Sequence, residues 1–62
     1  MAVEVTIKES FHPESIVCNV LGNENKKINQ PVVIYYKTSE SQTDEEARAA
    51  LQVIIENDEA PV

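Results

Sequence analysis

The stretch TDEEARAALQVIIEN, residues 43–57, decides the fold class. Thr43 and Glu46 stand at the spacing of a capping box, in which each side chain satisfies a backbone amide at the start of a helix. The apolar residues that follow repeat at helical spacing: Ala47, Ala50, Leu51, Ile54 and Ile55. The stretch therefore predicts an amphipathic helix of about four turns, whose apolar face must pack on another element.

The chain has 62 residues, which is enough for one small domain, taken as residues 1–62, with a thin core. Asn57 and Pro61 are expected to end the helix, because Asn suits a helix C-terminus and Pro cannot continue one. Residues 58–62 are then expected to form a loose tail.

Two segments outside the helix have the composition of strands. Residues 3–10 alternate, with the apolar side chains on one face: Val3, Val5 and Ile7. The same period puts Glu9 on the apolar face, so its carboxylate must lie beyond the core or meet a donor. The run VVIYY, residues 32–36, follows Pro31 without a polar break, which predicts a strand covered on both faces at the centre of the sheet.

Residues 13–21 fit two structures. Pro13 and Glu14 suit the first turn of a helix, and Gly22 suits its end. The β-branched run from Ile16 instead suits a strand, in a hairpin that turns through residues 22–25. We take the helix, with the strand as the alternative. The predicted fold is thus α+β, a small antiparallel sheet packed by the C-terminal amphipathic helix and by a short helix after the first strand.

The charge is uneven along the chain. The net charge is −6, residues 1–37 are neutral, and residues 38–62 hold seven acids against Arg48 alone. Direct nucleic-acid binding is disfavoured, because neutralising phosphates requires clustered Lys and Arg. The charge favours a basic protein partner, although solubility alone would also account for it.

The residues of most catalytic and metal sites are missing. His12 is the single imidazole and Cys18 the single thiol, six positions away in an apolar run, which makes a poor nucleophile and base pair. One His and one Cys also cannot complete a zinc site, and a single Gly excludes a glycine-rich phosphate loop. We expect no enzyme activity, no cofactor and no metal. A lone Cys without a leader or a spanning segment suggests a cytoplasmic protein.

Four segments, TIKES, PESIVCNVLGN, VVIYY and SESQTDEE, follow one another in an order that resembles the uracil-DNA glycosylase inhibitors of bacteriophages. The resemblance covers about half of the chain, mainly residues 5–23, with a weaker part at residues 32–46. Members of that family are acidic, non-enzymatic mimics of DNA. The resemblance implies a stoichiometric inhibitor that blocks the DNA-binding groove of a glycosylase and so evades host defence.

The resemblance also implies a partner-binding site. Glu9 and Ser10 would be the strand-end pair that meets the DNA-binding loops of the glycosylase, and Glu14 would be a second acid. An apolar pocket for the enzyme's intercalating side chain would be lined by Ile16, Val17, Val20, Leu21 and Val33. Glu14, Ser15 and Ile16 could instead be the equivalent motif. The alternatives are a small acidic structural or interaction module, including a homodimer, and an inhibitor of another nucleic-acid-binding protein.

Overall fold

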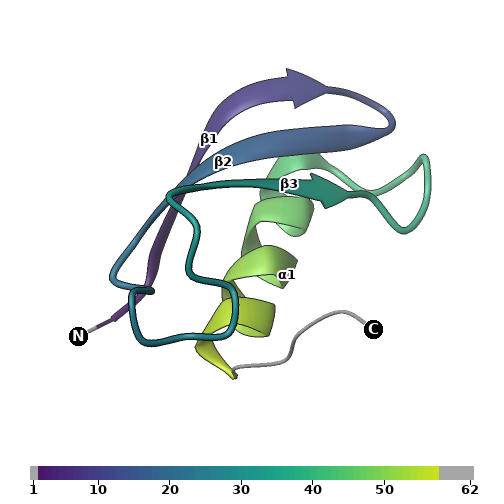
Figure 1. Cartoon of the computed structure of the whole chain (residues 1–62). Helices are drawn as coiled ribbons and strands as arrows, with labels where there is room; N and C mark the ends of the chain where they lie inside the picture. Colours follow the sequence, from purple (N-terminus) through teal and green to yellow (C-terminus); the bar gives the residue numbers. More distant parts are fainter. Residues whose placement is uncertain (1, 58–62) are drawn as a thin grey trace.

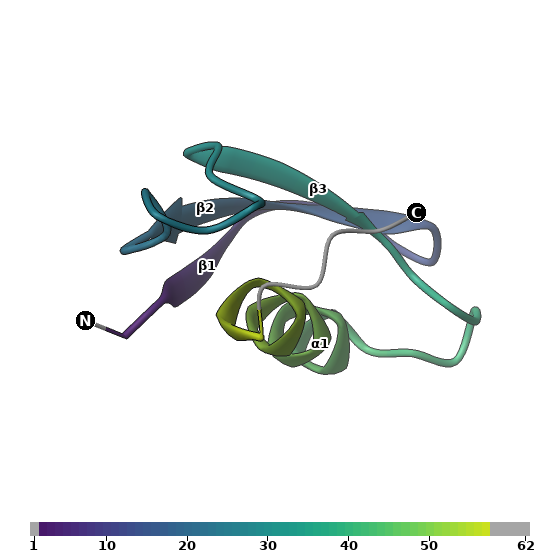
Figure 2. The same cartoon turned by 60° about the horizontal axis from the view of Figure 1, so that its bottom comes forward.

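The computed structural model describes residues 2–57, so the tail expected at residues 58–62 lies outside the described part. The elements in chain order are β1 (Glu4–Phe11), β2 (Ser15–Leu21), β3 (Val32–Tyr36) and α1 (Asp44–Glu56) (Figure 1). The three strands form one antiparallel sheet with the order β1-β2-β3. Figure 2 shows α1 packed along one face of this sheet. The α+β class with a small antiparallel sheet is confirmed.

The helix α1 begins and ends where the sequence predicts. Thr43 Oγ1 accepts a hydrogen bond from the Glu46 amide at 3.1 Å, and Glu46 Oε1 accepts one from the Thr43 amide at 2.8 Å. Both bonds satisfy amides that would otherwise have no partner in the first turn. At the other end Asn57 is the C-cap, and its amide bonds to the carbonyl of Val53 at 2.9 Å.

The core lies between α1 and the face of the sheet that we call the inner face. Successive side chains of a strand point to opposite faces, so alternate residues of β1 and β2 reach α1. Ile16, Cys18 and Ile55 are completely buried. The other buried apolar residues are Val3, Val5, Val20, Ala47 and Leu51. Each aliphatic side chain of this size contributes about 1.5–3 kcal/mol on burial.

The helix predicted after the first strand is wrong, because residues 15–21 form β2. Ile16, Cys18 and Val20 alternate with more polar or exposed neighbours, and this period of two suits a strand with one buried face. Pairing with β1 on one side and β3 on the other satisfies the backbone of β2 along its length. The strand alternative is confirmed, because residues 22–31 connect β2 to its antiparallel partner β3, and a separate turn at residues 12–14 connects β1 to β2.

The placement of VVIYY at the centre of the sheet is also wrong. The central strand is β2, and β3 is an edge strand. The helix covers one face only, so Val32, Ile34 and Tyr36 point to the opposite face, which we call the outer face. These three side chains are 44%, 53% and 73% exposed. An unbroken apolar run therefore reflects here a strand with one buried face and one apolar exposed face.

A β-bulge resolves the conflict at Glu9. The pairing of β1 with β2 shifts by one residue between Ile7 and Glu9, so Lys8 has no partner on β2. Ile7 stays on the inner face opposite Cys18, while Glu9 lies opposite Val17 on the outer face. A bulge inserts one extra residue into a strand and reverses the alternation that follows. The Glu9 carboxylate is consequently exposed, so the free-energy cost of burying a charged group does not arise.

Candidate functional site

The hairpin of β1 and β2 brings the two Glu-Ser pairs to the same end of the sheet. Ser10 pairs with Ile16 and Phe11 pairs with Ser15, while Glu14 lies in the turn between the strands. The end of β3 and the start of α1 lie at this end too (Figure 1). We call residues 9–15 with these two neighbours the hairpin end. Glu9 and Glu14 are both exposed there, and neither forms an ion pair with another described residue.

A buried lysine fixes the geometry of the hairpin end. The Lys37 side chain is completely buried, and its Nζ lies 2.6 Å from Asp44 Oδ1 at the start of α1. The same Nζ lies 2.6 Å from His12 Nδ1. The Lys37 amide also donates to the carbonyl of Glu14 at 2.8 Å. A single residue thus joins the hairpin turn, β3 and α1, and it holds Glu14 in a fixed place relative to the helix.

Protonation states follow from these contacts. An ammonium group has no lone pair, so Lys37 Nζ is the donor in its contact with His12 Nδ1. Hydrogen bonds from Lys37 and Ser10 hold the pKa of the Asp44 carboxyl below its ordinary value. The bonds from Arg48 do the same to the pKa of the carboxyl of Glu45, the next residue in the first turn of the helix. These carboxyl groups therefore stay ionised near neutral pH.

The outer face places apolar side chains beside the hairpin end. One cross-strand row consists of Glu9, Val17 and Ile34, because Val17 pairs with Glu9 on one side and with Ile34 on the other. The next row towards the turn consists of Phe11, Ser15 and Tyr36. Phe11 is 50% exposed, and Ser15 is buried between its two aromatic neighbours. The Glu9 side chain thus borders an exposed apolar surface of the sheet.

The predicted pocket residues do not come together as a single exposed surface. Ile16 and Val20 are a correction, because both lie in the core under α1 and neither can line a socket open to a partner. Val33 is half-buried on the inner face against the same core. Val17 lies on the outer face, and Leu21 is exposed opposite Glu4 at the far end of β2.

Three residues of the outer face, Phe11, Ile34 and Tyr36, have no place in the site predicted from the sequence. A strand assignment for residues 15–21 would have identified this surface, because it places Val17 on the face opposite Ile16. The register of β2 with its two neighbours then brings Phe11, Ile34 and Tyr36 to the same face. The signal was the alternation of polar and apolar residues in SIVCNVL.

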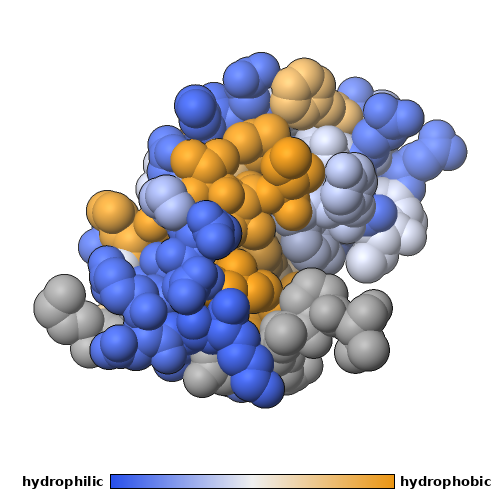
Figure 3. Space-filling view, in the orientation of Figure 1, coloured by the Kyte–Doolittle hydropathy of each residue, from blue (hydrophilic) through white to orange (hydrophobic). Residues whose placement is uncertain are grey.

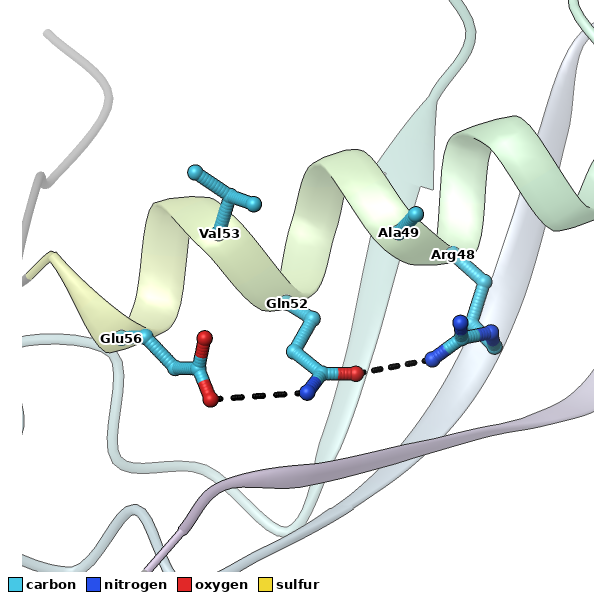
Figure 4. A pocket seen from close by; sticks show the side chains of 5 residues that line it. All are labelled: Arg48, Ala49, Gln52, Val53 and Glu56. Carbon is cyan, nitrogen blue, oxygen red and sulfur yellow. Dashed lines mark hydrogen bonds between the residues drawn. The ribbon is translucent and has the colours of Figure 1, made fainter.

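A hollow lies along the side of α1 that faces β1, lined by Arg48, Ala49, Gln52, Val53 and Glu56. Figure 4 shows Arg48, Gln52 and Glu56 on one face of the helix, joined by hydrogen bonds from Arg48 to Gln52 at 2.8 Å and from Gln52 to Glu56 at 3.4 Å. Arg48 Nη1 also reaches the carbonyl of Val5 at 3.4 Å, and Gln52 Nε2 reaches the carbonyl of Val3 at 3.3 Å. This row is structural, because it covers carbonyl groups at the free edge of β1.

Comparisons with known proteins do not assign the site. No family model, curated protein or solved structure matches this chain. Residues 2–57 contain no group of three or more His, Cys, Asp and Glu side chains placed to hold a metal ion. No helix among the described residues has the length and apolar character needed to cross a membrane. The geometry of the hairpin end and the outer face is therefore the basis for a functional proposal.

Proposed function

We propose that this chain is a non-enzymatic, acidic binding protein that occupies the basic DNA-binding groove of a uracil-DNA glycosylase and inhibits the enzyme stoichiometrically. One observation carries the proposal: the hairpin end displays Glu9 and Glu14 without ion-pair partners among residues 2–57, and Glu9 borders the apolar outer face. The order of the Glu-Ser and Pro-Glu segments in the sequence supplies the identity of the target.

The acidic half of the proposal rests on how such enzymes hold DNA. Half or more of the hydrogen bonds between a protein and DNA go to phosphate and sugar, donated by Arg, Lys, hydroxyl groups and backbone amides. A carboxylate accepts the same donors in short, charge-assisted bonds. Glu9 is held on a paired strand, and Glu14 is held by the Lys37 amide. The backbone of these two residues therefore loses little conformational entropy when a partner binds.

The apolar half rests on how a glycosylase opens the duplex. Enzymes that flip a base out of the helix pay for unstacking and insert side chains where the base stood. An inhibitor must offer an apolar surface to such a wedge, and burial of a Leu-sized group contributes about 1.5–3 kcal/mol. Val17, Ile34 and Tyr36 provide that surface next to Glu9. The outer face replaces the pocket that the sequence placed around Ile16 and Val20.

Inhibition of uracil excision tests the proposal directly. Purified glycosylase is mixed with the protein before a uracil-containing duplex is added. Uracil excision is followed with time by cleaving the DNA strand at the abasic sites that form. We expect excision to stop once the protein equals the enzyme in concentration, because a stoichiometric inhibitor titrates its target. Unchanged excision at a large excess of protein would exclude the glycosylase as the target.

A second candidate function is a small structural module that assembles through its sheet edges. The observation that favours it is the exposed apolar outer face together with the uncovered edge of β3. Light scattering separates the two functions, because a structural module predicts an obligate ring or larger assembly. Inhibition requires only a monomer or a dimer.

A further inference from the structure

We infer that the free edge of β3 is the contact surface of a two-fold symmetric homodimer, in which β3 pairs antiparallel with β3 of a second copy. Pairing at this edge leaves Glu9 and Glu14 outside the contact, although Ile34 and Tyr36 belong both to the contact and to the outer face. The inference does not depend on the proposed function, because the dimer is measured without a glycosylase. The two edges of the sheet differ in a way that points to β3. The edge of β3 has free hydrogen-bonding groups, a self-complementary register, an apolar hollow beneath it and opposite charges on its two sides.

The backbone groups of β3 that point away from β2 can be identified from its pairing. The Val20 amide donates to the carbonyl of Pro31 at 2.9 Å, and the Lys37 amide donates to the carbonyl of Glu14 at 2.8 Å. Along two antiparallel strands, a residue whose amide and carbonyl bond to the neighbouring strand alternates with one whose amide and carbonyl point away from it. The odd-numbered residues from 31 to 37 therefore bond to β2, and the amides and carbonyls of Val32, Ile34 and Tyr36 point outward. No other described strand pairs with them.

The two edges of the sheet are treated differently. The edge of β1 carries charged residues and a bulge, and Arg48 and Gln52 cover its carbonyls. These are devices that prevent a strand edge from pairing with another chain. The edge of β3 has no such protection, because residues 32–36 contain no charge, no Pro and no bulge. One edge is blocked and the other remains competent for strand addition.

The β3 edge is complementary to itself. Antiparallel pairing about a two-fold axis at Ile34 sets Ile34 opposite Ile34 of the second copy, and Val32 opposite Tyr36 of the second copy. Each of these three pairs exchanges two backbone bonds, which gives about six bonds across the contact. All three side chains lie on the outer face, so the pairing joins apolar residues that are exposed in one copy. The result is a continuous six-stranded sheet.

An apolar hollow under the edge gives the second copy a place for its inner-face side chains. The hollow has a volume of about 260 Å³ and lies between β3 and α1, and Figure 3 shows the apolar area there, bordered by hydrophilic side chains. Its lining residues are Ile28, Val33, Ile34, Tyr35, Tyr36, Leu51 and Ile54. In the proposed register Val33 lies opposite Tyr35 of the second copy on this inner face. The ring of Tyr35 of the second copy can then enter the hollow of the first copy from the side.

Charge complementarity favours a second copy of this chain as the partner that pairs with the β3 edge. The loop before β3, residues 22–31, carries Lys26 and Lys27 against Glu24, a net charge of +1. The segment after β3, residues 37–46, carries one Lys against four acids, a net charge of −3. Antiparallel pairing places the loop of each copy beside the acidic segment of the other. Asn23 holds this loop in shape through bonds from its Nδ2 to the carbonyls of Ile28 at 2.9 Å and Gln30 at 3.0 Å.

Sedimentation equilibrium of the full chain tests the inference. We expect twice the monomer mass of 6.9 kDa at micromolar concentrations. The substitution Ile34→Lys places like charges opposite each other at the axis and should raise the dimer dissociation constant more than about a hundredfold. Leu21→Lys is the matched control, because Leu21 is 65% exposed on the outer face and away from β3. It should leave the dimer intact.

A cross-link tests the register independently of affinity. Hydrogen-bonded antiparallel pairs have Cα atoms about 5.5 Å apart, which suits a disulfide. Oxidation of the Ile34→Cys variant should give a covalent dimer, whereas Leu21→Cys at the same concentration should not. The native Cys18 is buried and does not compete. A monomer at millimolar concentration, a larger assembly, a dimer insensitive to Ile34→Lys, or equal cross-linking by both variants would overturn the inference. Circular dichroism of each variant verifies that it is folded.

Discussion

Deletion of Lys8 tests why Glu9 faces outward. Lys8 is the extra residue of the β-bulge, and its removal leaves a regular strand in which Ile7 still opposes Cys18 and Glu9 still opposes Val17. The deletion should therefore keep every side chain on its present face. Because it removes an unpaired, exposed residue, we expect the free energy of unfolding to change by no more than about 1 kcal/mol.

The matched control is deletion of Thr6, which lies two positions earlier on the same strand. A one-residue slip sends every side chain before it to the opposite face. Val3 and Val5 would then leave the core, in which they are 2% and 6% exposed, and Glu4 would enter it. The loss of two buried valines costs about 3–6 kcal/mol at 1.5–3 kcal/mol each, before the cost of the buried carboxylate is added. That is much of the stability of a typical small domain, about 5–15 kcal/mol.

Urea denaturation followed by circular dichroism measures both deletions. The account predicts a midpoint near that of the parent for the Lys8 deletion and a largely unfolded chain for the Thr6 deletion. Equal destabilisation by the two would refute the reasoning, because the bulge would then contribute to the core in its own right. Loss of more than about 2 kcal/mol in the Lys8 variant alone would refute it too.

Three further predictions concern α1, the buried lysine and the thiol. Thr43→Ala should lower the free energy of unfolding by about 1 kcal/mol in urea melts, because it removes the N-cap bond to Glu46; no change would mean that the cap contributes nothing. The pKa of Asp44 is lower in the folded state than in the unfolded chain, so its stabilisation is present above about pH 4 and is lost as pH falls through the folded pKa. Melts along an acid series should show a shallower decline for Asp44→Asn, and an unchanged slope would argue against the Lys37 contact. Burial raises the pKa of the Cys18 thiol, so a thiol reagent should react only when the protein unfolds; rapid labelling in native buffer would contradict the core assignment.

The helix could be predicted from the sequence because its signals are local. Thr43 and Glu46 specify the first turn whatever lies around them, and the stripe of Ala47, Leu51 and Ile55 has a single period. The two strand errors have a different origin. Whether residues 15–21 are helix or strand depends on pairing with residues far away in the chain, and a Pro-Glu start resembles a helix N-terminus until β1 and β3 are in place.

The candidate site was predictable in part for the same reason. The two Glu-Ser pairs are close in the sequence, so their closeness in space was predictable. The structure places them at one end of the hairpin. The direction of Glu9 was not predictable, because a bulge at Lys8 leaves no signature in a single alternating run. The contacts of Lys37 with His12 and Asp44 join residues far apart in the chain, and only the assembled fold brings them together.

We propose that carboxylates at the hairpin end occupy the DNA-binding groove of a glycosylase. This proposal is tested most directly by the inhibition constant of Glu9→Gln compared with that of Glu4→Gln. Both residues are exposed acids of β1, and Glu4 lies at the opposite end of the strand. The account predicts that Glu9→Gln weakens inhibition about tenfold to a hundred and fifty-fold, the equivalent of a charged hydrogen bond worth about 1.5–3 kcal/mol, while Glu4→Gln changes it little. Equal inhibition by the two variants would contradict it.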